Sequence, residues 1–145
     1  MSRTLGANDV PTLAFDAVQE GDDLPVQTLF LTKDQVRDYA RAAGQWSPRF
    51  TDDEGARREG LPGMITPGNM SMGLLTALIE SWSGSGTLRR LGTTFRGLVI
   101  PDRTLRLCGA VTQKDERTST AELDVWIENE DGERPVIGTA TVRLA

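Results

Sequence analysis

The sequence predicts an α+β fold in one domain, with an antiparallel sheet wrapped around a long central helix. Residues 68–82 place apolar side chains on most sides of a helix, which is typical of a helix buried on more than one face. The segments after it alternate apolar and polar residues between turn signals, which is typical of an antiparallel meander with one buried face. A chain of 145 residues suits one domain.

The first segments predict an arm and one strand. Residues 1–14 are polar and contain a proline, so we expect a flexible N-terminal arm, with the domain itself covering residues 15–145. A short strand and turn are expected over residues 15–23. A second strand is expected over residues 26–31, where apolar and β-branched side chains cluster.

Two helices are expected before the central one. Thr32 and Gln35 have the spacing of a capping box, and the helix that they begin should end at Gly44. Residues 52–59 predict a short surface helix that the Gly-Leu-Pro-Gly sequence of residues 60–63 breaks.

Four strands are expected after the central helix. They cover residues 88–99, 104–113, 119–128 and 136–144. The third alternates Ala, Leu, Val and Ile with polar residues, and a favourable Asp-Gly turn precedes the fourth. One buried helix followed by such a meander is the order of elements in a hotdog fold.

Composition excludes several classes of function. A net charge of −5 and a pI near 4.8 argue against a nucleic-acid surface. No apolar run is long enough to span a membrane, and the N-terminus lacks a signal peptide, so we expect a cytoplasmic protein. The single Cys108 lies in a strand pattern and is expected in the core. The pairs Arg57-Arg58 and Arg89-Arg90 are expected on solvated surface, or alternatively as a seat for the phosphates of coenzyme A.

Three motifs carry a family resemblance. They are the loop of residues 44–52, the Ile-Thr-Pro-Gly-Asn-Met-Ser-Met-Gly sequence of residues 65–73, and the Phe-Arg-Gly-Leu-Val-Ile-Pro-Asp-Arg-Thr-Leu sequence of residues 95–105. Their order and spacing, with the strand-rich C-terminal half, resemble the MaoC-like hydratases and dehydratases over residues 20–145. The resemblance implies a hotdog domain that handles acyl thioesters.

The chain departs from the family pattern at the positions that carry the chemistry. The loop normally reads Gly-Asp-x-Asn-Pro-Ile/Leu-His-x-Asp, but Gln45 stands for the Asp, Ser47 for the Asn and Phe50 for the His. Pro67 replaces a second family histidine, and the chain contains no histidine at all. In the family, the Asp and His activate the water that adds to an enoyl thioester. Because neither an amide nor a phenyl ring exchanges protons near neutral pH, ordinary hydration is not expected.

The candidate catalytic residues are Gln45, Gly68 and Asn69. Gly68 would place backbone amides at a helix N-terminus, where a carbonyl oxygen or an oxyanion is favoured; alternatively, it only allows close packing. Gln45 and Asn69 would be neutral hydrogen-bonding partners. The residues expected to bind substrate are Trp46, Phe50, Met64, Pro67, Met70 and Met72. The alternative is that the tryptophan and the methionines fill the core.

No metal or cofactor is expected. Asp52 and Asp53 lie near the loop, where a helix N-cap is the favoured role.

Three functions fit these features. The first is an enzyme of the cyclase or lyase type that binds a hydrophobic polyketide or acyl substrate. It would promote a cyclisation or cycloaddition by positioning and hydrogen bonding, and the family implies a homodimer in that case. The second is a non-catalytic subunit of a heteromeric enoyl-CoA hydratase or dehydratase, paired with a MaoC-like chain that keeps the Asp and His. The third is an acyl-thioester binding module. A conventional hydratase with an unrecognised acid–base pair is the remaining alternative.

Overall fold

The structure, a computed structural model, describes residues 9–145. In this part of the chain, five strands form one antiparallel sheet in the order β1-β3-β4-β5-β2. The strands are β1 (Gln27–Leu31), β2 (Leu88–Phe95), β3 (Arg103–Asp115), β4 (Thr120–Glu128) and β5 (Val136–Arg143). The helices are η1 (Phe15–Ala17), α1 (Lys33–Ala42), α2 (Pro48–Thr51), α3 (Asp53–Arg58) and α4 (Gly68–Ser83).

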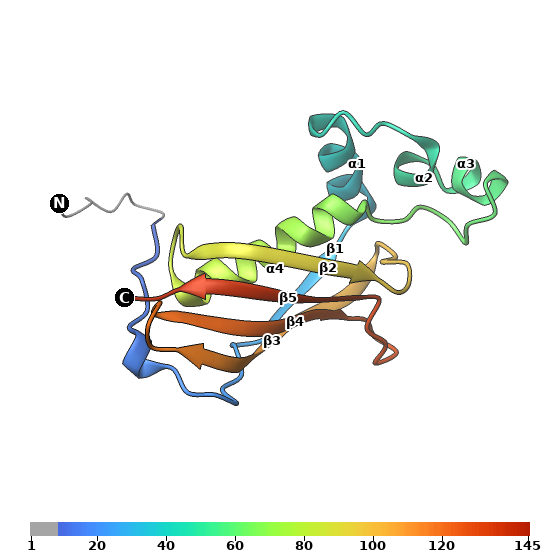
Figure 1. Cartoon of the computed structure of the whole chain (residues 1–145). Helices are drawn as coiled ribbons and strands as arrows, with labels where there is room; N and C mark the ends of the chain where they lie inside the picture. Colours follow the sequence, from blue (N-terminus) through green and yellow to red (C-terminus); the bar gives the residue numbers. More distant parts are fainter. Residues whose placement is uncertain (1–8) are drawn as a thin grey trace.

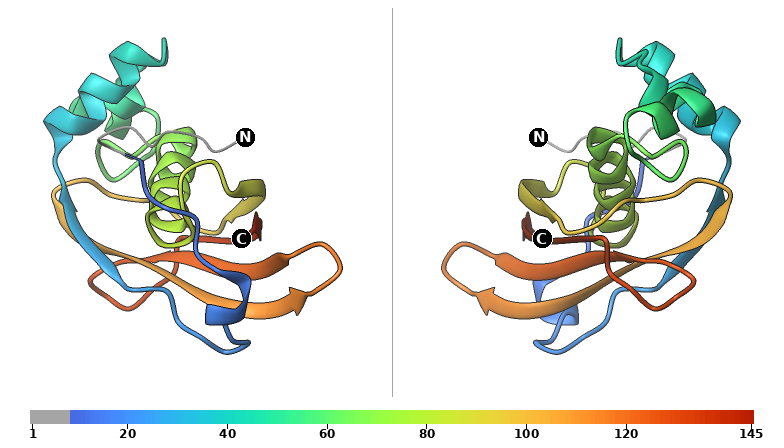
Figure 2. Two further views of the ribbon diagram at one scale, coloured as in Figure 1. Left: turned by 90° about the vertical axis from the view of Figure 1, so that its left-hand side faces the viewer. Right: turned by 90° about the vertical axis from the view of Figure 1, so that its right-hand side faces the viewer.

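The sheet curves around α4, and α1, α2 and α3 lie together beyond the N-terminal end of that helix (Figure 1). Views along the helix show α4 against the concave face of the sheet (Figure 2). The predicted α+β hotdog architecture is therefore confirmed, as is the single long central helix.

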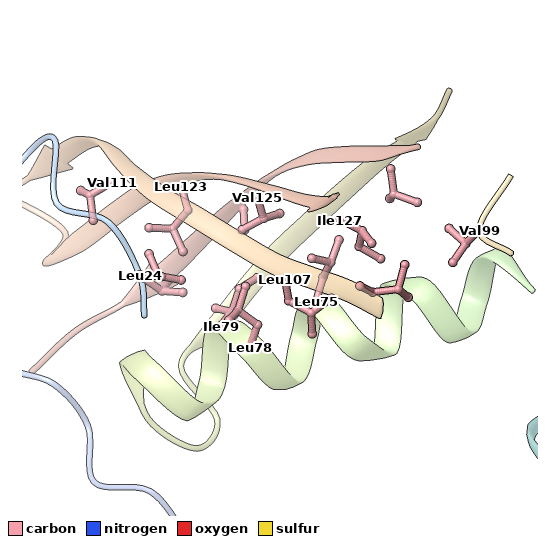
Figure 3. Packing of buried hydrophobic residues seen from close by; sticks show 14 of the residues in the cluster. Leu24, Leu75, Leu78, Ile79, Val99, Leu107, Val111, Leu123, Val125 and Ile127 are labelled. Carbon is pink, nitrogen blue, oxygen red and sulfur yellow. The ribbon is translucent and has the colours of Figure 1, made fainter. Parts of the chain in front are cut away.

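The core lies between α4 and the concave face of the sheet. Leu75, Leu78 and Ile79 of α4 face Val125 and Ile127 of β4 (Figure 3). Along β4 the residues alternate between buried and more exposed, which confirms the period of two read from the sequence. Cys108, in the neighbouring strand β3, is buried as predicted, and burial raises the pKa of its thiol.

The capping box at the start of α1 is also confirmed. The Gln35 amide donates to Thr32 Oγ1 over 3.1 Å, and the Thr32 amide donates to Gln35 Oε1 over 2.9 Å. Gly44 follows the helix with a φ of 69°, a conformation that costs glycine little and most other residues more. The chain therefore turns at Gly44 into the loop that leads to α2.

Two predicted strands are corrected. The segment of residues 15–23 contains the short helix η1 and a turn, and only an isolated bridge joins Asp23 to Ala110. The strand predicted over residues 88–99 ends at Phe95. It ends there because the amides of Arg96 and Gly97 both donate to the Pro135 carbonyl oxygen, at 2.8 and 3.1 Å, which takes the chain out of the ladder.

Part of the predicted arm can be placed. Residues 1–8 lie outside the described residues. After them, the Leu13 amide donates to the Ser83 carbonyl oxygen over 2.9 Å, and the Ser85 amide donates to the Val10 carbonyl oxygen over 3.0 Å. These bonds join the segment to the C-terminal end of α4, while its mobility stays a prediction. Within residues 9–145, no helix combines the length and the apolar character that a membrane crossing requires.

Candidate functional site

The loop of residues 64–67 positions the start of α4 through three consecutive backbone amides. The Met64 amide donates to Asp53 Oδ1 over 2.9 Å. The next two amides, of Ile65 and Thr66, donate to the carbonyl oxygens of Arg49 and Val99, both over 2.8 Å. Each bond reaches a different segment, so α3, α2 and the loop after β2 together fix where α4 begins.

The first turn of α4 has unused hydrogen-bond donors. Pro67 is the N-cap residue, and it provides no side-chain bond. The amides of Met70 and Ser71 both donate to the Pro67 carbonyl oxygen, at 3.1 and 3.2 Å. Among the described residues, the amides of Gly68 and Asn69 have no acceptor. They lie at the positive end of the helix dipole, where a carbonyl oxygen or an anion is favoured.

Gly68 lies under the ring of Phe95. A Cβ atom at residue 68 would be 2.8 Å from Phe95 Cζ, closer than real Cβ atoms approach. Gly68 therefore allows close packing, one of the two roles considered for it. The Phe95 side chain is 51% exposed, so the ring covers the helix start without being locked in the core.

Gln45 and Phe50 lie on either side of the start of α2. Gln45 follows α1, and its Oε1 atom is buried without a partner in the described structure. Phe50 lies in α2 and packs partly buried against the core. The carbonyl oxygen of Arg49, between them, accepts the Ile65 amide and so connects this loop to the residues before α4.

The other residues expected to bind substrate are spread over several environments. Trp46 is 56% exposed, with the Arg41 guanidinium carbon 4.9 Å from its ring centroid. Met64 is 1% exposed and belongs to the core. Pro67 is buried, Met70 and Met72 are half-buried, and Asn69 is exposed.

The two carboxylates near the loop have structural partners. Asp52 Oδ2 accepts the Gly55 amide over 3.1 Å and caps α3, as predicted. Asp53 bonds Lys33 Nζ over 2.8 Å, in addition to the Met64 amide. The hydrogen bond from Lys33 and then that from the Met64 amide hold the pKa of Asp53 below its usual value. Asp53 therefore stays ionised and is a poor proton donor.

The arginine pairs have intramolecular partners. Arg57 Nε donates to the Pro62 carbonyl oxygen over 3.3 Å, and Arg58 lies 3.7 Å from Glu54. Arg89 donates to the Gly86 carbonyl oxygen over 2.8 Å, and Arg90 lies 3.5 Å from Glu122. All four are exposed, as expected for solvated surface.

A hollow of about 490 Å³ lies on the outer side of the sheet. Its lining includes Gly92 of β2, Trp126 of β4 and Ile137 of β5. None of the predicted site residues lines it. In residues 9–145, no group of three potential metal ligands comes together.

Two hydroxyl groups beside the helix start were missed by sequence reasoning. Thr66 Oγ1 and Ser71 Oγ are buried and have no partner among the described residues. The available signal was their position: Thr66 precedes the N-cap residue, and Ser71 is the fourth residue of α4, a pair of positions that apolar side chains often fill.

The chain is similar to a known protein family and to several solved structures. The family described as "MaoC like domain" matches residues 16–131. The ChsH1-ChsH2 complex from Mycobacterium tuberculosis contains a chain 18% identical to this one, with a TM-score of 0.80, covering 88% of this chain and 98% of that one. The (R)-hydratase from A. caviae involved in PHA biosynthesis is 20% identical, with a TM-score of 0.83 and coverages of 89% and 98%.

A third structure is longer than this chain. A MaoC-like dehydratase is 27% identical, with a TM-score of 0.88, and the match covers 100% of this chain but 49% of that one. This chain therefore spans about half the length of that protein. No curated protein matches the chain.

Proposed function

Because this chain belongs to the MaoC like domain family, we propose that it binds an apolar acyl or polyketide chain at the N-terminus of α4 and does not hydrate it alone. The observation that carries the proposal is the pair of free amides at Gly68 and Asn69. A carbonyl oxygen of the substrate would accept hydrogen bonds from them, at the favourable end of the helix dipole.

We infer that this chain does not activate water because of the residues at two positions, 45 and 50. Hydration needs a group that takes a proton from water and a group that gives one back. Gln45 and Phe50, at the positions that the family uses for this purpose, offer an amide and a phenyl ring. Asp53, a nearby carboxylate, is held ionised by Lys33 and is already committed to the Met64 amide.

One form of the proposal is a non-catalytic subunit paired with a MaoC-like chain that carries the acid and the base. The ChsH1-ChsH2 complex, a structural neighbour, consists of two differently named chains. Strand β2 is an edge of the sheet, with β5 on one side, so it can accept a strand from a partner. The exposed Phe95 and Leu98 lie at the end of that strand and just beyond it.

The other form is an enzyme that promotes a cyclisation or cycloaddition. Such a reaction needs the reacting atoms held together and a carbonyl polarised, but little proton transfer. Its support is the same replacement of proton-transfer groups by Gln45 and Phe50. In this form the chain would act as a homodimer.

The test is a hydration assay of the purified chain with trans-2-butenoyl-CoA and trans-2-decenoyl-CoA, following the loss of the conjugated thioester absorbance. The Gln45→Asp/Phe50→His double variant runs beside it. We expect no turnover by the unaltered chain, and measurable turnover by the double variant would support a surviving thioester site. Hydration by the unaltered chain would contradict the proposal.

Whether the chain needs a partner distinguishes the non-catalytic subunit from the cyclisation enzyme. Mixing with a MaoC-like chain from the same source that carries both the acid and the base would give a stable complex and hydration in the first form. The second form, the cyclisation enzyme, would be favoured by a stable homodimer that does not bind such chains. Its turnover of a polyene substrate would be lost in the Gln45→Leu variant.

A further inference from the structure

The outer hollow, of about 490 Å³, lies on the face of the sheet that is turned away from α4. Along β4, Leu123, Val125 and Ile127 are buried on the side of α4 (Figure 3). Asp124 and Trp126 alternate with them and line the hollow, so they point to the opposite face. The volume is in the range of small-molecule pockets. The outer hollow is therefore a candidate binding site separate from the N-terminus of α4.

The strand register explains why the sheet is hollow here. Asp124 of β4 pairs with Thr139 of β5, and Thr139 pairs with Gly92 of β2, so this row across three strands has little side-chain volume. In the next row, Trp126 pairs with Ile137 and supplies larger side chains. All five residues line the hollow. It therefore has an apolar side at Trp126 and Ile137 and a polar side at Asp124 and Thr139.

Asp124 is the first of two charged residues in the lining, and its carboxylate has no partner within residues 9–145. The other acidic side chains on the outer face of β4 do have partners. Glu122 lies 3.5 Å from Arg90, and Glu128 lies 4.0 Å from Arg106. The exposed Asp124 therefore remains an available acceptor for a cation.

Arg134 is the second charged residue in the lining. Its guanidinium carbon lies 4.2 Å from the centroid of the Trp126 ring, so a cation–π contact holds it in place. It has no carboxylate partner in the described part of the chain. The contact with the ring leaves the guanidinium N–H groups available to an anion. Trp126 Nε1 is a further unused donor, because it is buried and has no partner among the described residues.

Asp124 and Arg134 line one hollow without forming an ion pair with each other, which leaves room for a ligand between them. We propose that the outer hollow binds a small zwitterion of the amino-acid type with an apolar side chain. Its ammonium group meets Asp124, its carboxylate meets Arg134, and its side chain packs against Trp126 and Ile137. A ligand with one charge leaves either Asp124 or Arg134 unpaired. This site lies away from α4 and does not depend on the proposed function.

The test follows the indole N–H resonances of the three tryptophans by NMR while a probe is added. The resonance missing from Trp126→Phe is that of Trp126. The probes are L-phenylalanine, L-leucine, glycine, L-phenylalanine amide and N-acetyl-L-phenylalanine, at about pH 6, where a free α-amino group is charged. We expect L-phenylalanine to move the Trp126 resonance and to bind about fivefold more tightly than the amide or the N-acetyl compound. Glycine, which lacks an apolar side chain, should bind more weakly still.

Two variants assign the charges of the ligand. Asp124→Asn should remove the preference for L-phenylalanine over N-acetyl-L-phenylalanine, and Arg134→Gln should remove the preference over the amide. Both replace exposed side chains, so folding should be retained. The matched control is Glu54→Gln, which alters an exposed pair with Arg58 on α3 and should keep both preferences.

Three outcomes would overturn the inference. The first is a Trp126 resonance that moves with neither L-phenylalanine nor L-leucine. The second is equal binding of the zwitterion and the two singly charged probes by the unaltered chain. The third is a lower particle mass of Asp124→Asn in sedimentation, because the hollow would then be filled by a second copy of the chain.

Discussion

The two ends of α4 differ in whether their polar groups have hydrogen-bond partners. At the C-terminal end, the hydroxyls of Ser83 and Thr87 lie 2.6 Å apart, and the carbonyl oxygens of Ile79 and Gly84 are further acceptors within hydrogen-bonding distance of them. At the N-terminal end, two amides and two buried hydroxyls have no partner among the described residues. The difference teaches that the polar groups at one end of the helix are used to stabilise the fold, while those at the other end stay available, where we propose that a ligand binds.

The largest effect is expected from Gly84→Ala at the C-terminal end. Gly84 has a φ of 117°, and a Cβ there would lie 2.6 Å from Thr12 Cα and 2.8 Å from the Pro11 carbonyl oxygen. Because backbone atoms cannot easily retreat, we expect a loss of about 2–4 kcal/mol in the free energy of unfolding, measured in urea.

The control for that variant is Gly73→Ala in the middle of α4. A Cβ at residue 73 would meet no atom within 4 Å. Alanine favours a helix by about 0.5–1 kcal/mol over glycine, so stability should rise slightly. A similar loss of stability in Gly84→Ala and Gly73→Ala would contradict the expected difference between these two positions.

The next effect is expected from Thr87→Val, which keeps the shape and removes the hydroxyl. Thr87 is 3% exposed, and its Oγ1 donates to the Gly84 carbonyl oxygen over 2.7 Å. We expect a loss of about 1–2 kcal/mol on urea unfolding, because a buried bond is broken and Ser83 loses a partner. Thr66→Val, the same change at the other end of α4, should cost nothing; an equal loss would remove the difference between the two ends.

A smaller effect is expected from Gly68→Ala at the N-terminal end. The added methyl would meet only the tip of the half-exposed Phe95 ring, which can move aside. We expect a loss of about 1 kcal/mol and a coupling between the two positions in a double-mutant cycle with Phe95→Ala. Additive losses would show that the ring does not rest on Gly68.

The smallest effect concerns Asp53, which holds the loop before α4. The hydrogen bond from Lys33 lowers the pKa of Asp53 in the folded protein, so the folded state binds its proton less readily than the unfolded state. The resulting stabilisation is present above the ordinary carboxyl pKa of about 4 and is lost as the pH falls through the lower folded value.

Urea unfolding at pH 7 and at pH 3 should therefore show a smaller pH effect in Asp53→Asn than in the unaltered chain. The matched control is Asp38→Asn, which removes a carboxylate from an exposed pair with Arg41 on α1. An unchanged pH effect in Asp53→Asn would contradict this role of the carboxylate.

The sequence by itself determined the elements that depend on neighbours in the chain. The Thr32–Gln35 capping box and the alternation along β4 are local patterns, and the structure confirms both. The long helix α4 is confirmed too, but its fully buried residues lie along one side, while Gly73, Ala77 and Ser81 are exposed. Local geometry fixes a helix cap or a strand period within a few residues. For that reason the architecture of a helix wrapped by a meander could be predicted.

Only the tertiary structure decided which polar groups find partners. The bond from the Thr66 amide to Val99 and the bonds that end β2 at Phe95 join residues more than thirty positions apart in the chain. No local pattern shows that the Phe95 ring rests on Gly68, 27 residues before it in the chain. Hydrogen-bond satisfaction depends on the sum of contacts that folding brings together, so the unpartnered hydroxyls of Thr66 and Ser71 became visible only in the folded chain.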